Sequence, residues 1–321
     1  MRQAILDFPK QFAFEPKVEN PRGAKHYDRY IIAGMGGSAL PGALLAQENL
    51  DIPIMAHRNY GFPHLTDKEL EKTLVIAISY SGNTEETLDA FQTALDRGID
   101  VCAISVGGKL IAQAQQRGVP YIQLPDAGIL PRMALGFIMM ALLVALGRKD
   151  ILKSLCQLAS TLHADEYEDA GRRLAEQLLR RVPIIYASEH NAAIAYIWKI
   201  IFNETSKIPA FCNVLPEVNH NEMEGFDVHE STKHLSDNFV CILIKDGEDN
   251  PRIIRRMEIL AKLYQKRGIE THEIEMEGAT RLFKIFSSIV LANWASFYIA
   301  ESYGIDPESV PMVEEFKRII V

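Results

Sequence analysis

The chain has 321 residues and a formal net charge of −8, with 48% hydrophobic and 24% charged residues. This length allows two domains with separate cores, and the composition is that of a soluble globular protein. The acidic balance argues against nucleic acid or an anionic membrane as the main partner. The first residues lack the apolar core of a signal peptide, and the most apolar stretch, 134–146, is too short to span a bilayer. We therefore expect a cytoplasmic protein.

Apolar strands alternate with helices through the first half of the chain. Strands of this kind indicate a parallel sheet that is covered on both faces. The strands are expected at 30–33, 52–56, 73–78, 101–106 and 121–124, and the helices at 39–47, 84–97, 109–117 and 137–146.

A charged helical stretch at 150–181 is expected to connect this half to a second half with a similar layout. The predicted fold class is therefore α/β, with two doubly wound, flavodoxin-like parallel-sheet domains at 1–150 and 151–321. The later strands are expected at 183–188, 239–244 and 271–274, and the later helices at 192–203, 253–267, 279–303 and 312–320.

The loop after the strand at 73–78 is dense in hydroxyl groups. Thr84 stands where it can cap the next helix, and free backbone N–H groups and the helix dipole attract anions at such a position. The hydroxyls of Ser79, Ser81 and Thr84 can point at the same place, so the loop predicts a phosphate cradle. The simpler alternative is a strand-to-helix turn rich in capping residues. No G-x-x-x-x-G-K-[ST] motif is present, so a nucleotide-hydrolysing P-loop is not expected.

A glycine-rich loop follows the first buried strand. It fits the loose dinucleotide pattern G-x-G-x-x-[GA], but the second strand ends at His57-Arg58 and offers no acid for a ribose. The amides of Gly36 and Gly37 and the hydroxyl of Ser38 are instead expected beside the hydroxyl-rich loop, because both loops leave the carboxyl ends of parallel strands. Two such loops favour a sugar phosphate over NAD.

A strand that enters G-x-G-x-S, followed by a later strand that enters S-x-S-G-x-T, resembles the sugar isomerase (SIS) fold. Three further segments resemble the bifunctional phosphoglucose/phosphomannose isomerases, in the family's order along the chain. They are the proline-arginine stretch 130–137, the Asn-Glu-x-x-Lys segment 203–207 and the Asn-His-Asn-Glu motif 219–222. The resemblance implies two SIS domains, the first with the phosphate loops and the second with a catalytic glutamate and histidine.

The resemblance also implies a reaction, the interconversion of glucose 6-phosphate or mannose 6-phosphate with fructose 6-phosphate through a cis-enediolate. This reaction needs a carboxylate to move a proton, a cation beside the enediolate and an acid–base group to open the ring. Taken alone, Glu204, Arg132 and His220 fit ordinary surface charges. The resemblance implies that they are the base, the enediolate cation and a ring-opening group, with Lys317 as a second ring-opening group.

The resemblance implies a homodimer in which His220 reaches the neighbouring subunit's site, and it implies neither a metal nor another cofactor. His229, Glu230 and His234 lie close together in the sequence, but their spacing does not place three of them as ligands of one metal ion, so a metal site is not predicted there either. Two alternatives stay open. One is a SIS isomerase of another sugar phosphate, and the other is a catalytically silent sugar-phosphate sensor, which would not need the three catalytic groups together.

One segment departs from the family's pattern. Asp306-Pro307-Glu308-Ser309-Val310 stands where the family commonly has Asp-Pro-Thr-Pro-Val, and its threonine is thought to leave space for both C2 epimers. The glutamate either crowds one epimer or points into solvent. The departure predicts unequal use of the two epimers.

Overall fold

The structure, a computed structural model, describes residues 1–23, 25–48 and 53–320; residue 52, the expected start of a strand, lies outside these ranges. The chain divides into two compact units. One is Asp7–Leu162, and the other joins Met1–Leu6 to the residues from His163 onward. The sequence places the domain boundary at residue 150, whereas the units divide between residues 162 and 163, within the same charged helical stretch.

The unit Asp7–Leu162 contains, in its described residues, a six-stranded sheet in the order β1-β6-β5-β4-β2-β3. The strands β2 to β6 are parallel, and the short edge strand β1 is antiparallel to β6. The bounds are β1 Val18–Glu19, β2 Arg29–Gly34, β3 Ile54–His57, β4 Thr73–Ile78, β5 Asp100–Ser105 and β6 Tyr121–Gln123. Because β2 lies between β3 and β4, the strand order reverses there, which is the topological switch point where ligands bind in such sheets.

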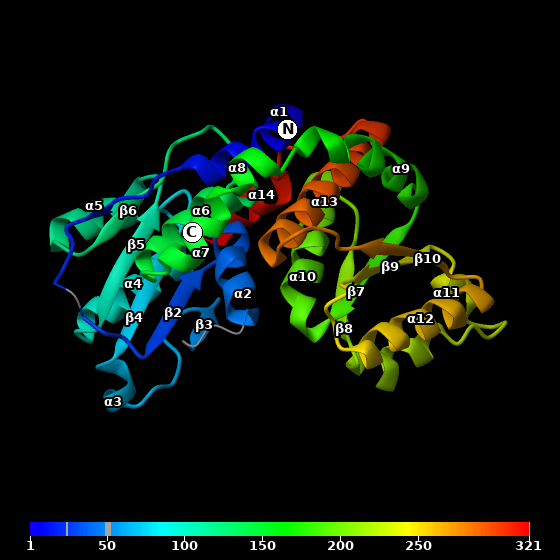
Figure 1. Cartoon of the computed structure of the whole chain (residues 1–321), viewed down its shortest axis with the longest axis horizontal. Helices are drawn as coiled ribbons and strands as arrows, with labels where there is room; N and C mark the ends of the chain where they lie inside the picture. The colour runs from blue at the N-terminus through cyan, green and yellow to red at the C-terminus, as the bar shows by residue number, and fades with distance from the viewer. Residues whose placement is uncertain (24, 49–52, 321) are drawn as a thin grey trace. The chain divides into compact units, whose positions relative to one another are not determined.

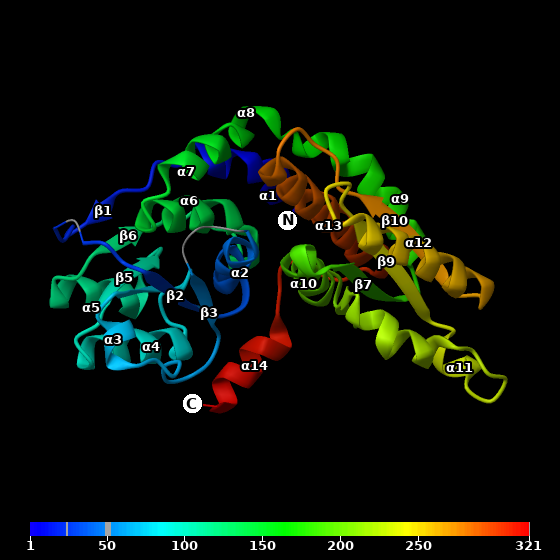
Figure 2. The same cartoon turned by 60° about the horizontal axis from the view of Figure 1, so that its bottom comes forward.

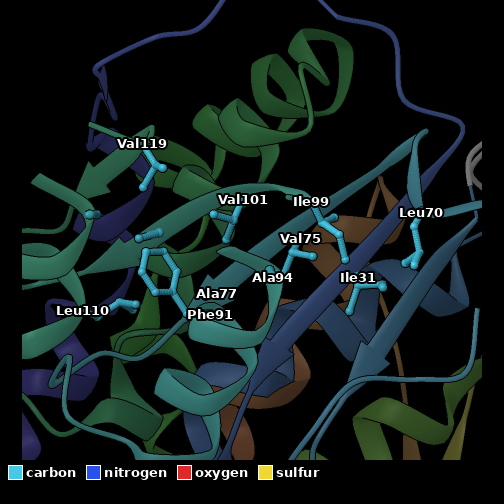
Figure 3. Packing of buried hydrophobic residues seen from close by; sticks show 12 residues of the cluster. Ile31, Leu70, Val75, Ala77, Phe91, Ala94, Ile99, Val101, Leu110 and Val119 are labelled. Atoms are coloured by element: carbon cyan, nitrogen blue, oxygen red, sulfur yellow. The ribbon is translucent and has the colours of Figure 1, made fainter. Parts of the chain in front are cut away.

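Helices cover both faces of this sheet (Figure 1, Figure 2). On one face Phe91 of α4 and Leu110 of α5 pack with Val75 of β4 in a buried cluster (Figure 3). On the other face α2 lies so close to β2 that a Cβ on Gly42 would be 2.7 Å from the Ile32 side chain. The helices of this unit are α2 Leu40–Gln47, α3 Asp67–Leu70, α4 Glu85–Asp96, α5 Gly108–Arg117, α6 Leu135–Ala145, α7 Lys149–Cys156 and α8 Leu158–Thr161.

The unit that includes His163 contains a four-stranded parallel sheet in the order β10-β9-β7-β8, again counted over described residues. Its first strand, β7, is flanked by β8 and β9, so the switch point recurs. Tyr264 of α12 packs with Tyr186 of β7 on one face, and α10 lies against β7 and β8. The strands are β7 Val182–Ser188, β8 Phe211–Leu215, β9 Phe239–Lys245 and β10 Glu270–Glu275, and the helices are α1 Arg2–Leu6, α9 Glu168–Leu178, α10 Ala192–Ile201, α11 Lys233–Ser236, α12 Pro251–Lys266, α13 Arg281–Tyr303 and α14 Pro311–Ile320.

The predicted class, two doubly wound α/β domains, is confirmed. All six residues of β4 are buried, as expected of a parallel strand covered on both faces. The edge strand β8 was not predicted, because Phe211 is 53% exposed and only Leu215 is buried, so no apolar run marks it. By length and composition α13 is apolar enough to cross a membrane, but 83% of its most apolar window is buried, as in a core helix.

Candidate active site

The switch point of the first sheet brings the two predicted phosphate loops side by side. Gly34, the last residue of β2, pairs with Ile78, the last residue of β4, so both loops leave the sheet at the same level. The first loop forms the 3₁₀ turn Gly36–Ala39, which Gly36 opens with a φ of 51°. From this turn the hydroxyl of Ser38 accepts a hydrogen bond of 3.0 Å from the Tyr80 N–H in the second loop.

Ser79 is the centre of the second loop. Its hydroxyl, which is fully buried, accepts from the N–H of Gly82 at 3.0 Å and lies 2.8 Å from the Thr84 hydroxyl. Thr84 stands at the N-cap position of α4, as predicted, but its side chain makes no capping hydrogen bond and its hydroxyl lies beside Ser79 instead. Ser81 is exposed, and its hydroxyl accepts from Asn83 N–H within the loop. The structure therefore brings the Ser79 and Thr84 hydroxyls together, holds Ser38 against the backbone of the same loop at Tyr80, and leaves Ser81 exposed at the edge of that loop.

Arg132 lies against the glycine turn. It belongs to the 3₁₀ turn Pro131–Met133, and its backbone packs so closely on Gly37 that a Cβ there would lie 2.7 Å from the Arg132 nitrogen. Only a glycine fits this contact without moving backbone. Arg132 as a whole residue is 4% exposed, so it is buried and not the surface charge that its residue type alone suggests. A guanidinium offers a planar fork of donors suited to phosphate or enediolate oxygens.

Glu204 lies in the other compact unit, on a single π-helical turn, Phe202–Ser206, that continues α10. Its side chain is half-buried. The helix before it is held in the core by Trp198, which is fully buried and donates its indole N–H to the Ser288 hydroxyl at 3.0 Å. The carboxylate is therefore carried by a rigid core helix at the point where that helix departs from α-helical geometry.

His220 is exposed at the end of the 3₁₀ turn Glu217–His220. The loop that carries it is firmly anchored, although the sequence favours an irregular polar loop. Glu222 accepts a 2.6 Å hydrogen bond from the Tyr186 hydroxyl and a second bond from the Asn213 amide. Burial raises the pKa of Tyr186, so its hydroxyl stays protonated and remains a donor. His220 thus projects from a fixed support toward solvent.

Lys317 is exposed on α14, whose residues are all exposed where the structure describes them. In the segment before this helix, the Glu308 carboxylate lies 2.8 Å from the amino nitrogen of Met1 and its own N–H donates to Asp306. The side chain of Glu308 is 56% exposed.

The expected site residues therefore fall into two sets. The phosphate-loop residues and Arg132 belong to the unit Asp7–Leu162, and Glu204, His220 and Lys317 belong to the other unit. Sequence reasoning missed the anchoring contacts of Glu222 and of Lys207, although both residues stand in the motifs that it singled out. Among the described residues, no group of three or more His, Cys, Asp or Glu side chains is placed to hold a metal ion.

Comparison with known proteins identifies the family of the chain. Residues 167–320 match the family model described as bacterial phospho-glucose isomerase C-terminal SIS domain. A bifunctional phosphoglucose/phosphomannose isomerase of Caldicellulosiruptor bescii is 38% identical, with 99% of this chain and 98% of that protein covered. The protein of the same name from Aquifex aeolicus is 33% identical, with 98% and 97% covered. Among solved structures, glucosamine-6-phosphate deaminase from Thermotoga maritima shares the fold, with a TM-score of 0.71, 16% identity and 97% of each chain covered. The chain belongs to the family of bifunctional phosphoglucose/phosphomannose isomerases.

Proposed function

We propose that this protein is an aldose–ketose isomerase that interconverts glucose 6-phosphate and mannose 6-phosphate with fructose 6-phosphate through a cis-enediolate. The observation that carries the proposal is the sheet switch point, where the hydroxyls of Ser79 and Thr84 lie 2.8 Å apart and the backbone of the buried Arg132 packs on Gly37 of the neighbouring loop. Hydroxyls at a helix N-terminus, with an arginine held in the same unit, suit a phosphorylated, negatively charged reactant. Membership of the family supports the choice of hexose.

Each step of the reaction has a proposed residue. Gly36, Gly37, Ser38, Ser79, Ser81 and Thr84 hold the phosphate through backbone amides and hydroxyls. Glu204 removes a proton from one of the two carbons C1 and C2 and returns it to the other. Arg132 stabilises the negative charge of the enediolate, since its guanidinium keeps its charge at any working pH. These residues themselves supply the acid–base and electrostatic groups that the isomerisation needs.

Ring opening is assigned to His220 and Lys317. Histidine suits proton transfer near neutral pH, and His220 is exposed on an anchored loop, which supports a role in a second copy of the chain. The proposed assembly is a homodimer with shared sites, in the cytoplasm. The exposed placement of Lys317 on α14 is compatible with a group that meets substrate rather than the core.

The test is an assay of fructose 6-phosphate formation from each aldose phosphate. We expect activity with both epimers, with kcat/KM values that differ by more than about twofold, because discrimination arises before the shared enediolate. Glu204→Gln keeps the shape of the side chain but cannot accept the proton, so kcat should fall at least about 100-fold while sugar-phosphate binding stays nearly intact. Glu176→Gln, an exposed residue of α9 in the same unit, is the matched control.

Two other results would contradict the proposal. Binding of hexose phosphates without turnover would indicate a sugar-phosphate sensor, and turnover of an amino sugar phosphate alone would indicate another SIS isomerase. Activity of Glu204→Gln within a few-fold of the unaltered protein would show that a different residue is the base.

A further inference from the structure

Glu204 lies on backbone with two locally unfavourable features. The turn Phe202–Ser206 is π-helical, a rare form that occurs mostly as single turns, frequently at functional sites. Lys207, which ends the turn, has a φ of 55°, a left-handed conformation that residues other than glycine seldom adopt. Such backbone persists only where the surrounding contacts hold it in place. The contacts of this turn therefore show what fixes the direction of Glu204.

The Lys207 ammonium group closes the carboxyl end of the turn. It donates to the carbonyl oxygens of Glu204 at 2.8 Å and of Thr205 at 3.4 Å. Carbonyls at the end of a helix have no amide partner and carry negative partial charge. An ammonium group supplies the missing hydrogen-bond donor and offsets that charge. The Lys207 side chain thus folds back toward Glu204, three residues earlier in the chain.

The same ammonium group reaches a distant segment. Its nitrogen donates to the carbonyl oxygen of Asp306 at 2.9 Å, and Asp306 and Lys207 are 99 positions apart. The Asp306 carboxylate in turn accepts from the N–H of Glu308 at 2.9 Å, which orders the segment that leads into α14 and Lys317. One cation with three donors therefore joins the turn that carries Glu204 to the segment before α14.

The opposite side of the turn is held by packing in the core. The hydroxyls of Ser206 and Ser296 are both fully buried and lie 2.6 Å apart, and the Ser296 hydroxyl donates to the Ile201 carbonyl at 3.0 Å. These contacts attach the turn to α13. They do not reach the 306–310 segment, so the link to that segment described here depends on Lys207.

We propose that Lys207 is a positioning residue for catalysis: it fixes the turn that carries Glu204 and ties that turn to the segment before α14. The inference rests on the proposed role of Glu204 as the base. Lys207 acts through backbone carbonyls and does not itself touch substrate. Its loss should therefore misplace the base while leaving phosphate binding to other residues.

The test compares Lys207→Met, which keeps the aliphatic stem and removes the charge, with Lys207→Arg, which keeps a cationic donor. Lys262→Met, an exposed lysine on α12, is the matched control. For Lys207→Met we expect kcat to fall about 10- to 100-fold with KM within about twofold, because misplacing a catalytic group by 1 Å has effects of this size. Lys207→Arg should recover part of kcat.

Amide hydrogen exchange gives a readout that does not depend on activity. We expect faster exchange in both 202–207 and 306–310 for Lys207→Met, and no change for Lys262→Met. If Lys207→Met does not fold, Lys207→Gln takes its place with the same expectations. Unchanged kcat, unchanged exchange in either segment, or a loss that appears only in KM would overturn the inference. Inactivity of the unaltered protein would instead contradict the proposed function, and exchange would still decide whether Lys207 joins the two segments.

Discussion

Gly37 is a residue of the candidate site at which the absence of a side chain matters. Its Cα faces the backbone of Pro131 and Arg132, and a Cβ would lie 2.7 Å from two of their backbone atoms. Backbone atoms cannot rotate away as the end of a flexible side chain can. A single methyl group at this position would therefore push the glycine turn and the arginine apart.

We predict that Gly37→Ala lowers the free energy of unfolding by about 1–3 kcal/mol, as overpacking does elsewhere. Because the displaced turn carries Ser38, KM for fructose 6-phosphate should rise about tenfold, which corresponds to 1.4 kcal/mol of binding. Urea unfolding and steady-state kinetics measure the two effects. Gly225→Ala, where the added methyl meets nothing within 4 Å, is the control. Unchanged stability and KM would show that the two turns separate freely.

At the scale of elements, the two switch points differ in what fills them. In the first sheet the loops present hydroxyls and amides. In the second sheet the equivalent loops are filled by the unit's own charges: the Ser188 hydroxyl donates to the Asp249 carboxylate at 2.6 Å, and Asp246 pairs with Lys284 at 2.9 Å and Arg281 at 3.0 Å. An internal carboxylate thus lies at the position that corresponds to the proposed phosphate site of the first unit.

Asp246 gives this polar cluster a pH dependence. Burial opposes its ionisation, but hydrogen bonds from Lys284 and from the Glu248 N–H and the nearby charges outweigh it, so its pKa lies below the ordinary 3.8. A carboxylate with a lowered folded-state pKa stabilises the fold fully above its ordinary pKa, and this contribution is lost as the pH falls through the folded value.

We predict that Asp246→Asn lowers the free energy of unfolding at pH 7 by about 3 kcal/mol, because it leaves a buried cation without its main partner. The difference from the unaltered protein should shrink as the pH falls below 3.8 and through the lower folded-state pKa, because the carboxyl is protonated first in the unfolded state and then in the folded state. Urea unfolding from pH 7 down into this acid range measures it. Asp237→Asn, an exposed residue in the same unit, should change little. A difference that does not depend on pH would rule out the ion pair as its cause.

At the scale of the whole molecule, the proposed dimer makes a prediction about mixed chains. Glu204→Gln and His220→Ala should each be inactive alone. If each site takes His220 from the partner, a hybrid dimer has one site with both defects and one with neither. Random exchange of subunits should then restore about a quarter of the unaltered activity, since half of the dimers are hybrids.

The control for this experiment is a mixture of Glu204→Gln and Glu204→Ala chains, in which every site lacks the base. It should stay inactive. Recovery only in the first mixture supports shared sites. If the first mixture also stays inactive although hybrid dimers form, each site takes both residues from one chain, and the shared-site proposal fails.

Much of the fold followed from the sequence because buried parallel strands are apolar throughout. The apolar runs at 73–78 and 101–106 each predict a strand covered on both faces, and the helical stretch between them starts after Thr84, at the N-cap position of α4. The edge strand β8 could not be found in this way, since its exposed Phe211 and half-buried Asn213 leave no pattern. Its place depends on pairing with β7, a contact between residues more than 20 positions apart.

For the candidate site, the sequence already shows which residue types stand in the two phosphate loops and in the motifs around Glu204 and His220, because each of these motifs is made of residues that are neighbours in the chain. The folded structure was needed to find that Arg132 is buried against Gly37, that Glu222 anchors the His220 loop, and that Lys207 binds the carbonyl of Asp306. Each of these contacts joins segments distant in the chain, and their geometry depends on how the sheet and helices pack.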